Sequence, residues 1–76
     1  MSAYTLVKNG IQYKKFDGFE LKDSVDIEPC IFAPLWLDQE LAEQDTILGP
    51  NNDQLIVFCW EPVKLNGQEF LKIHCI

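Results

Sequence analysis

The stretch Gln54-Leu55-Ile56-Val57-Phe58-Cys59-Trp60 decides how the rest of the chain is arranged. One polar residue is followed by six apolar ones, between the turn-forming Asn51-Asn52-Asp53 and the pair Glu61-Pro62. A short apolar run between turn residues, rich in β-branched and aromatic types, is typical of a strand that is apolar on both faces. We therefore predict a central strand of a sheet over residues 54–60.

A hairpin is predicted directly after this strand, closed by Asn66-Gly67, a dipeptide that tolerates the two positive φ angles of a type I′ turn. Two pairs of opposite charge result from that turn: Lys64 with Glu69, and Glu61 with Lys72. The same register pairs Val63 with Phe70, Trp60 with Ile73, Cys59 with His74, and Phe58 with Cys75. Pro62 has no amide proton, so we expect it to remove one hydrogen bond from the ladder.

A second hairpin is predicted over residues 4–15, with Asn9-Gly10 as its turn. Its register places four side chains on one core-facing side: Tyr4, Leu6, Ile11 and Tyr13. Asp17-Gly18 indicates a further turn. Phe16, just before it, is even-numbered, whereas Ile11 and Tyr13 on the same strand are odd-numbered, so a regular strand would point Phe16 to the opposite face. Either a bulge at Lys14-Lys15 or a longer loop at residues 17–18 resolves this conflict, and the bulge is favoured.

The segment Cys30–Leu37 contains no charged residue, and Pro29 and Pro34 lie before and within it. Each proline lacks the amide proton that a ladder needs, which argues against a central strand. Three large side chains are expected to lie over the sheet as a lid: Ile31, Phe32 and Trp36. The polar segment Lys22–Glu28 is predicted to be a connection.

One short helix is predicted within residues 34–45. Asp38 would cap a helix running from Gln39 to about Gln44. A start at Pro34 is the alternative, and it would place Leu37 and Leu41 on one face. The predicted fold is therefore α+β but mostly β, with a small antiparallel sheet of about five strands that bends into a half-open barrel. Residues 1–76 are expected to form a single domain.

The charge of the chain is concentrated in its middle. The net charge is −6, and between Lys22 and Lys64 there are nine acidic residues and no basic one. A field of one sign repels nucleic acid and anionic membranes and attracts cationic partners. The three cysteines cannot all pair with one another and form no Cys-x-x-Cys motif, so we expect free thiols in a reducing, cytoplasmic setting. Neither a signal peptide nor a membrane span is indicated.

Only one pair of residues suggests chemistry. The hairpin register places Cys59 opposite His74, the single histidine, and a thiol beside an imidazole is either a nucleophile with its base or two metal ligands. A strand-end histidine beside a thiol is the favoured interpretation, because no third ligand or orienting acid has a supporting spacing. No cofactor motif or hydrolase motif is present, and we expect a protein that is not an enzyme.

The composition favours a small acidic protein-binding module that engages a basic protein surface, as inhibitors, immunity-type proteins and nucleic-acid mimics do. Phe32 and Trp36 are the candidate apolar anchors, and the candidate acidic contacts are Asp38, Glu40 and Glu43. Two alternatives remain at this point. One is a small-ligand or metal-binding module that uses the sheet face near Cys59 and His74, and the other is a homodimeric structural subunit.

Overall fold

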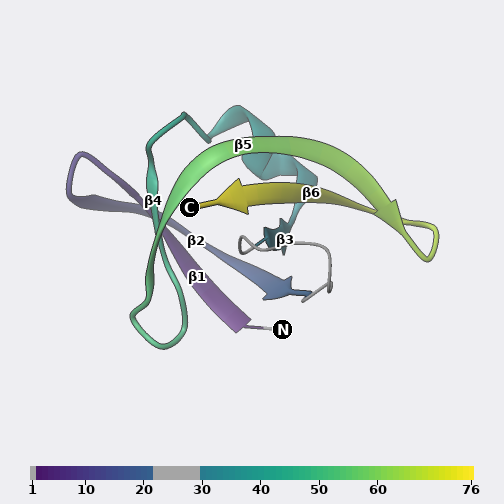
Figure 1. Ribbon diagram of the computed structural model, residues 1–76, viewed down its shortest axis with the longest axis horizontal. Coiled ribbons are helices and arrows are strands. Elements are labelled where there is room, and N and C mark those ends of the chain that lie inside the picture. Colours follow the sequence, from purple (N-terminus) through teal and green to yellow (C-terminus); the bar gives the residue numbers. More distant parts are fainter. Residues whose placement is uncertain (1, 22–29) are drawn as a thin grey trace.

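The computed structural model of the protein describes residues 2–21 and 30–76. Within them, six antiparallel strands close into a barrel in the order β1-β2-β3-β6-β5-β4 (Figure 1). The strands are β1 (Ser2–Lys8), β2 (Ile11–Glu20), β3 (Cys30–Ala33), β4 (Thr46–Leu48), β5 (Gln54–Leu65) and β6 (Gln68–Cys75). The mostly β, antiparallel prediction is confirmed, whereas the five-strand, half-open sheet is corrected to six strands in a closed barrel.

The predicted helix is reduced to one short 3-10 helix, η1 (Leu35–Gln39). It begins after Pro34, whose φ of −62° suits the start of a helix, and the Leu37 amide donates to the Pro34 carbonyl at 3.1 Å. Leu37 and Leu41 are both buried, as the alternative start predicted. The Asp38-capped helix over residues 39–44 does not form, and so short a helix leaves the fold mostly β.

The hairpin of β5 and β6 has the predicted register near its turn. Asn66 and Gly67 have φ angles of 51° and 80°, as a type I′ turn requires. The confirmed pairs are Lys64–Glu69, Val63–Phe70, Glu61–Lys72, Trp60–Ile73 and Cys59–His74. Beyond them Val57 pairs with Cys75, so Phe58 is an extra residue in a β-bulge and the predicted Phe58–Cys75 pair is wrong.

Pro62 lies opposite Leu71 in this ladder. In a hairpin with a two-residue turn, the pair next to the turn exchanges hydrogen bonds and successive pairs alternate. By that alternation Pro62 belongs to a pair that exchanges none, and its nitrogen points away from β6. The proline therefore removes no bond from the ladder, contrary to expectation. Pro62 lies beyond the part of β5 that pairs with β4, because that pairing ends at Ile56. A proline at this position discourages pairing with another chain.

The β1–β2 hairpin also has the predicted turn, with φ angles of 52° at Asn9 and 78° at Gly10. Its bulge lies at Tyr13 and not at Lys14-Lys15, because Val7 pairs with Gln12 while Leu6 pairs with Lys14. The shift brings Phe16 into the core, where its ring stacks on the Tyr4 ring with 5.5 Å between the ring centroids. Two residues predicted to face the core are instead exposed: Ile11 (71%) and Tyr13 (49%).

Asp17-Gly18 is not a turn, because β2 continues through it to Glu20. A Cβ atom on Gly18 would lie 2.8 Å from the carbonyl oxygen of Phe32. Only glycine allows the two strands to approach so closely at this point. The glycine that suggested a turn is thus required by the crossing of β2 and β3.

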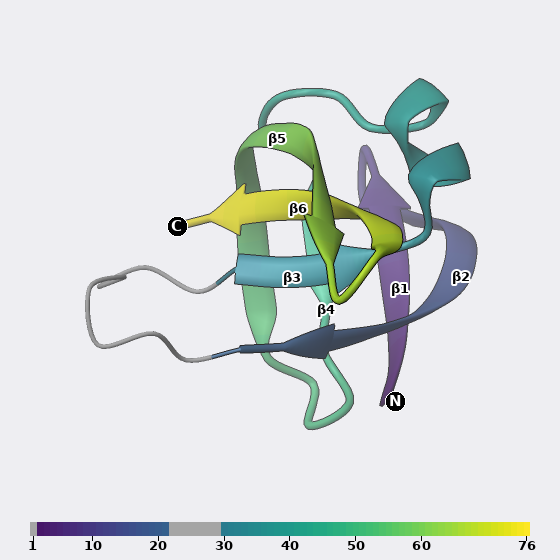
Figure 2. The same cartoon turned by 90° about the vertical axis from the view of Figure 1, so that its right-hand side faces the viewer.

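The strand β3 is the main correction to the predicted topology. Figure 2 shows it alongside β6, and it pairs with β2 on its other side. Pro34 lies just after the strand, so it removes no ladder donor. All four residues of β3 are buried, so Ile31 and Phe32 belong to the sheet and not to a lid, while Trp36 on η1 is half-exposed. The predicted connection Lys22–Glu28 lies outside the described residues.

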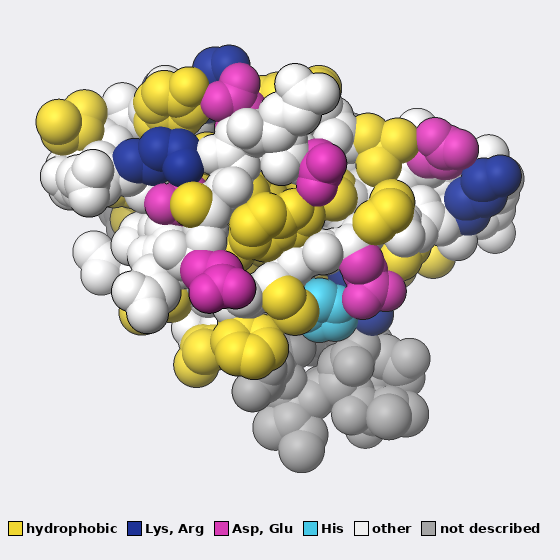
Figure 3. Space-filling view, turned by 90° about the horizontal axis from the view of Figure 1, so that it is seen from above, with side chains coloured by type: hydrophobic (Ala, Val, Ile, Leu, Met, Phe, Trp, Pro, Cys, Tyr) yellow, Lys and Arg dark blue, Asp and Glu magenta, His cyan; other side chains and the backbone are white. Residues whose placement is uncertain are grey.

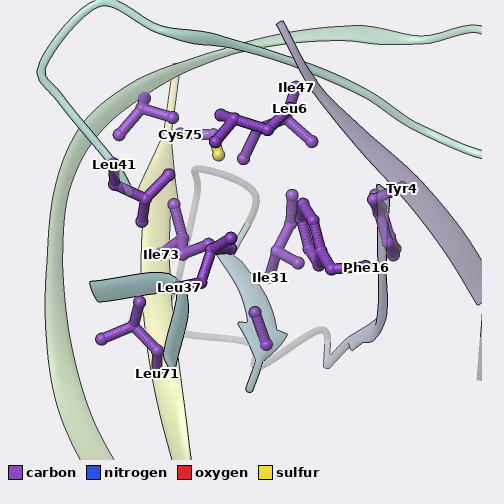
Figure 4. Close-up of a cluster of buried hydrophobic side chains, with 12 residues drawn as sticks. Tyr4, Leu6, Phe16, Ile31, Leu37, Leu41, Ile47, Leu71, Ile73 and Cys75 are labelled. Carbon is purple, nitrogen blue, oxygen red and sulfur yellow. The ribbon is translucent and has the colours of Figure 1, made fainter. Parts of the chain in front are cut away.

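The core fills the interior of the barrel. Its fully buried large side chains come from every strand except β2, together with one from η1: Leu6, Ile31, Leu37, Ile47, Val57, Leu71, Ile73 and Cys75. Figure 4 shows Leu37 and Leu41 beside Leu71 and Ile73, so η1 and the residues after it cover part of the interior.

Candidate functional site

The bulge in β5 creates an apolar surface on the outside of the barrel. Val57 points into the core and is 1% exposed, whereas the next side chain, Phe58, is 56% exposed. Beside it, Ile56 and Ile76 exchange both backbone hydrogen bonds, at 3.3 and 2.9 Å, and both side chains are exposed. Three apolar side chains thus lie together on the exterior, where one extra residue has turned Phe58 outward.

These side chains line a groove of about 690 Å³, which we call the Phe58 groove. Its lining residues are Glu43, Gln44, Ile56, Val57, Phe58, Cys59 and Ile76. The segment before β4 forms one wall, because the Gln44 amide donates to the Val57 carbonyl at 2.9 Å and the Val57 amide donates to the Asp45 carbonyl at 2.8 Å. Figure 3 shows this side of the molecule, on which hydrophobic side chains lie among acidic ones.

Of the five predicted contact residues, only Glu43 lines the groove. Phe32 is 6% exposed, because two other rings pack on it. The Phe19 ring stacks on the Phe32 ring with 5.3 Å between the ring centroids, and the Phe70 ring meets it edge-on with 6.4 Å between the centroids. Asp38 accepts a hydrogen bond from Trp60 Nε1 at 2.8 Å. Phe32 and Asp38 therefore make their contacts within the protein.

The two remaining residues, Trp36 and Glu40, are brought together by Lys14. The Lys14 Nζ lies 5.5 Å from the Trp36 ring and 2.7 Å from Glu40 Oε1, while the Tyr13 hydroxyl donates to Glu40 Oε2 at 2.9 Å. The hydrogen bonds from Lys14 and then from Tyr13 lower the pKa of the Glu40 carboxyl. Glu43 differs from Glu40 in that, among the described residues, it forms no ion pair with a lysine.

His74 contacts a different thiol from the one predicted. It pairs with Cys59 in the register, but its Nδ1 lies 3.5 Å from Cys30 Sγ, and its Nε2 lies 3.5 Å from Glu61 Oε2. The described part of the chain contains no group of three or more His, Cys, Asp or Glu side chains that would hold a metal ion. The third thiol, Cys75, is fully buried, and desolvation raises its pKa to about 12.

The apolar residues of the groove were not predicted as a site. The available signal was the run of six apolar residues in β5, since only one face of a barrel strand can be covered by the core. Ile56, Phe58 and Cys59 are the part of that run left outside. Ile76 has no distinguishing sequence context, and only its pairing with Ile56 identifies it.

Comparison with protein-family models, curated protein sequences and solved structures gives no match to this chain. Among residues 2–21 and 30–76, no helix has the length and apolar character needed to cross a bilayer.

Proposed function

We propose that the protein is a non-enzymatic binding module that engages a basic surface of a partner protein through the Phe58 groove. The observation that supports this most strongly is the exposed trio of Ile56, Phe58 and Ile76, which lines a groove beside an acidic residue. Apolar anchors surrounded by polar groups are typical of protein interfaces, and aromatic anchors provide a large share of binding energy.

The charge of the chain indicates the chemistry of the partner. The net charge is −6, and two of the described lysines are already neutralised, Lys8 by Asp45 at 2.6 Å and Lys14 by Glu40 at 2.7 Å. Glu43 at the groove forms no ion pair with a lysine of the described residues, and we expect it to face a cation of the partner. A partner that presents Lys or Arg around an apolar side chain is complementary to this surface, and its association is accelerated by long-range attraction.

The same charge argues against a second copy as the occupant of the groove, because two chains of −6 repel one another. Trp36, Asp38 and Glu40 would lie outside the central contact, and the carboxylates of Asp38 and Glu40 would contribute mainly to the field that attracts the partner. Rim charges of this kind change the association rate and its salt dependence more than they change the affinity.

The proposal is tested by capture from the native host's lysate with four baits: wild type, Phe58→Ser, Glu43→Gln and Ile11→Ser. Ile11 is the matched control, because it is an exposed isoleucine that does not line the groove. The captured protein is identified by mass spectrometry, purified, and its binding to each bait is measured at low and high salt.

We expect wild type and Ile11→Ser to bind one basic protein equally, Phe58→Ser to lose it, and Glu43→Gln to bind it more weakly with a smaller salt dependence. Equal capture by wild type and Phe58→Ser would contradict the proposal, and so would an acidic partner. Absence of any partner, with light scattering showing a dimer that Phe58→Ser abolishes, would replace the proposal with self-association.

A further inference from the structure

The outer face of the sheet carries a thiol, an imidazole and a carboxylate from three adjacent strands. Cys30 on β3 lies opposite His74 on β6, and Glu61 extends from β5 on the other side of the histidine. Cys30 Sγ lies 3.5 Å from His74 Nδ1, and Glu61 Oε2 lies 3.5 Å from His74 Nε2. The imidazole therefore has its two nitrogens directed to different groups. Figure 3 shows the histidine next to an acidic side chain.

This arrangement selects one form of the neutral imidazole. A carboxylate beside Nε2 favours the proton on that nitrogen, so the lone pair is on Nδ1 and is directed at the thiol. A nucleophile, a base within reach and a third group that orients the base form the usual arrangement of an activated thiol. Among the described residues, this face also carries Cys59, Asp17 beside Phe32 and Phe70, and Lys72, whose Nζ lies 6.0 Å from the centre of the Phe32 ring.

We propose that Cys30 is a nucleophilic thiol, with His74 as its base and Glu61 as a positioning residue, that captures small α,β-unsaturated carbonyl compounds covalently. The Cys30 proton passes to His74 Nδ1, and the Sγ–C bond forms at the β-carbon of the alkene. The π electron pair moves to the α-carbon, which then takes the proton from His74. No leaving group, oxidant or second reactant is needed.

The burial of the thiol restricts the compounds that can react. Cys30 is 4% exposed, whereas Cys59 is exposed and Cys75 is inside the core. We expect a small electrophile to reach this thiol and a bulky one to be excluded. Cys75 serves as an internal negative control, because a buried thiol whose pKa is raised to about 12 stays protonated. The three cysteines thus provide different expected reactivities within one chain.

The experiment uses the full chain with acrylamide, a small unsaturated amide, and with a polymer-linked maleimide as the bulky reagent. Peptide mapping by mass spectrometry gives the rate at each cysteine at neutral pH. We expect acrylamide to modify Cys30 faster than Cys59, maleimide to modify only Cys59, and neither reagent to modify Cys75 before unfolding. His74→Gln is expected to slow addition to Cys30 roughly tenfold or more, with Cys59 unchanged.

Glu61→Gln provides a second test on a side chain that is 60% exposed and tolerates substitution. It is expected to slow Cys30 and, in nitrogen NMR spectra of His74, to reduce the fraction of the ring protonated at Nε2, a change that a purely structural role would not produce. An unmodified Cys30 in the native protein, or equal Cys30 rates in wild type and His74→Gln, would overturn the inference. None of these outcomes depends on partner binding at the Phe58 groove.

Discussion

The two long hairpins of the barrel have the same design and differ in where their extra residue lies. Both close with an Asn-Gly turn in which the two residues have positive φ angles, and both contain one bulge. In β2 the bulge at Tyr13 brings Phe16 into the core, and the Tyr13 hydroxyl bonds to Glu40. In β5 the bulge turns Phe58 to the outside. One extra residue thus completes the core in the first hairpin and exposes an apolar ring in the second.

The largest expected effect is the difference in stability between a variant that truncates Phe16 and a variant that truncates Phe58. Phe16 is 5% exposed and Phe58 is 56% exposed, so Phe16→Ala should lower the free energy of unfolding by about 3–5 kcal/mol, whereas Phe58→Ala should lower it by about 1 kcal/mol or less. Urea unfolding followed by Trp fluorescence measures both values. Equal losses in the two variants would contradict the different placement of the rings.

A smaller effect is expected at the crossing of β2 and β3. Gly18→Ala places a methyl group against the backbone of Phe32, and we expect a loss of about 1–3 kcal/mol in the free energy of unfolding. Gly49→Ala is the control, because its nearest contact would be an ordinary 3.6 Å to the Asp53 Cβ. A neutral Gly18→Ala would indicate that residues 17–18 form an exposed turn, as the sequence alone indicated.

The two turns should respond alike. Gly10 and Gly67 have φ angles of 78° and 80°, and a Cβ on either would meet no atom within 4 Å. The alanine variants should therefore each lose about 1–2 kcal/mol, from the left-handed backbone alone. Thermal or urea unfolding of the matched pair measures the losses. A large difference between them would mean that the two turns are not of the same type.

The smallest expected effect concerns the partner of Tyr13. The hydrogen bonds from Lys14 and Tyr13 lower the pKa of Glu40 in the folded protein. Their contribution to stability is therefore present at pH values above the usual glutamate pKa of about 4.5, and it is lost as the pH falls through the lowered pKa. Carbon NMR titration should show Glu40 below its ordinary value in wild type and closer to it in Lys14→Met. An unchanged titration in that variant would show that Lys14 does not hold the carboxylate.

The sequence predicted the features of the fold that depend on local chemistry. Both Asn-Gly turns and the β5–β6 register up to Cys59 follow from turn geometry and opposite charges. The closure of the barrel was not predictable in this way, since it depends on β4 (Thr46–Leu48), a three-residue strand that follows the segment 34–45 and for which no strand was predicted. The bulge of β2 was misplaced and the bulge of β5 was not predicted, because the face to which each side chain of a strand points depends on its partners across the whole barrel.

The candidate site followed less closely from the sequence. The acidic character and His74 were identified, but Phe32 is buried under other rings, and the histidine was predicted beside Cys59 whereas its ring contacts Cys30. The pairing of β3 with β6 brings Cys30 there. Long-range pairing decides which apolar residues remain outside, and composition does not contain that information.

Amide chemical-shift mapping shows whether the bulged Phe58 presents the binding surface. The isotope-labelled protein is titrated with the basic partner recovered by capture. We predict that the largest shifts occur at Glu43, Ile56, Phe58 and Ile76 and that they shrink as salt is added. Shifts concentrated on Ile11 and Tyr13, or spread evenly over all acidic residues, would contradict the account.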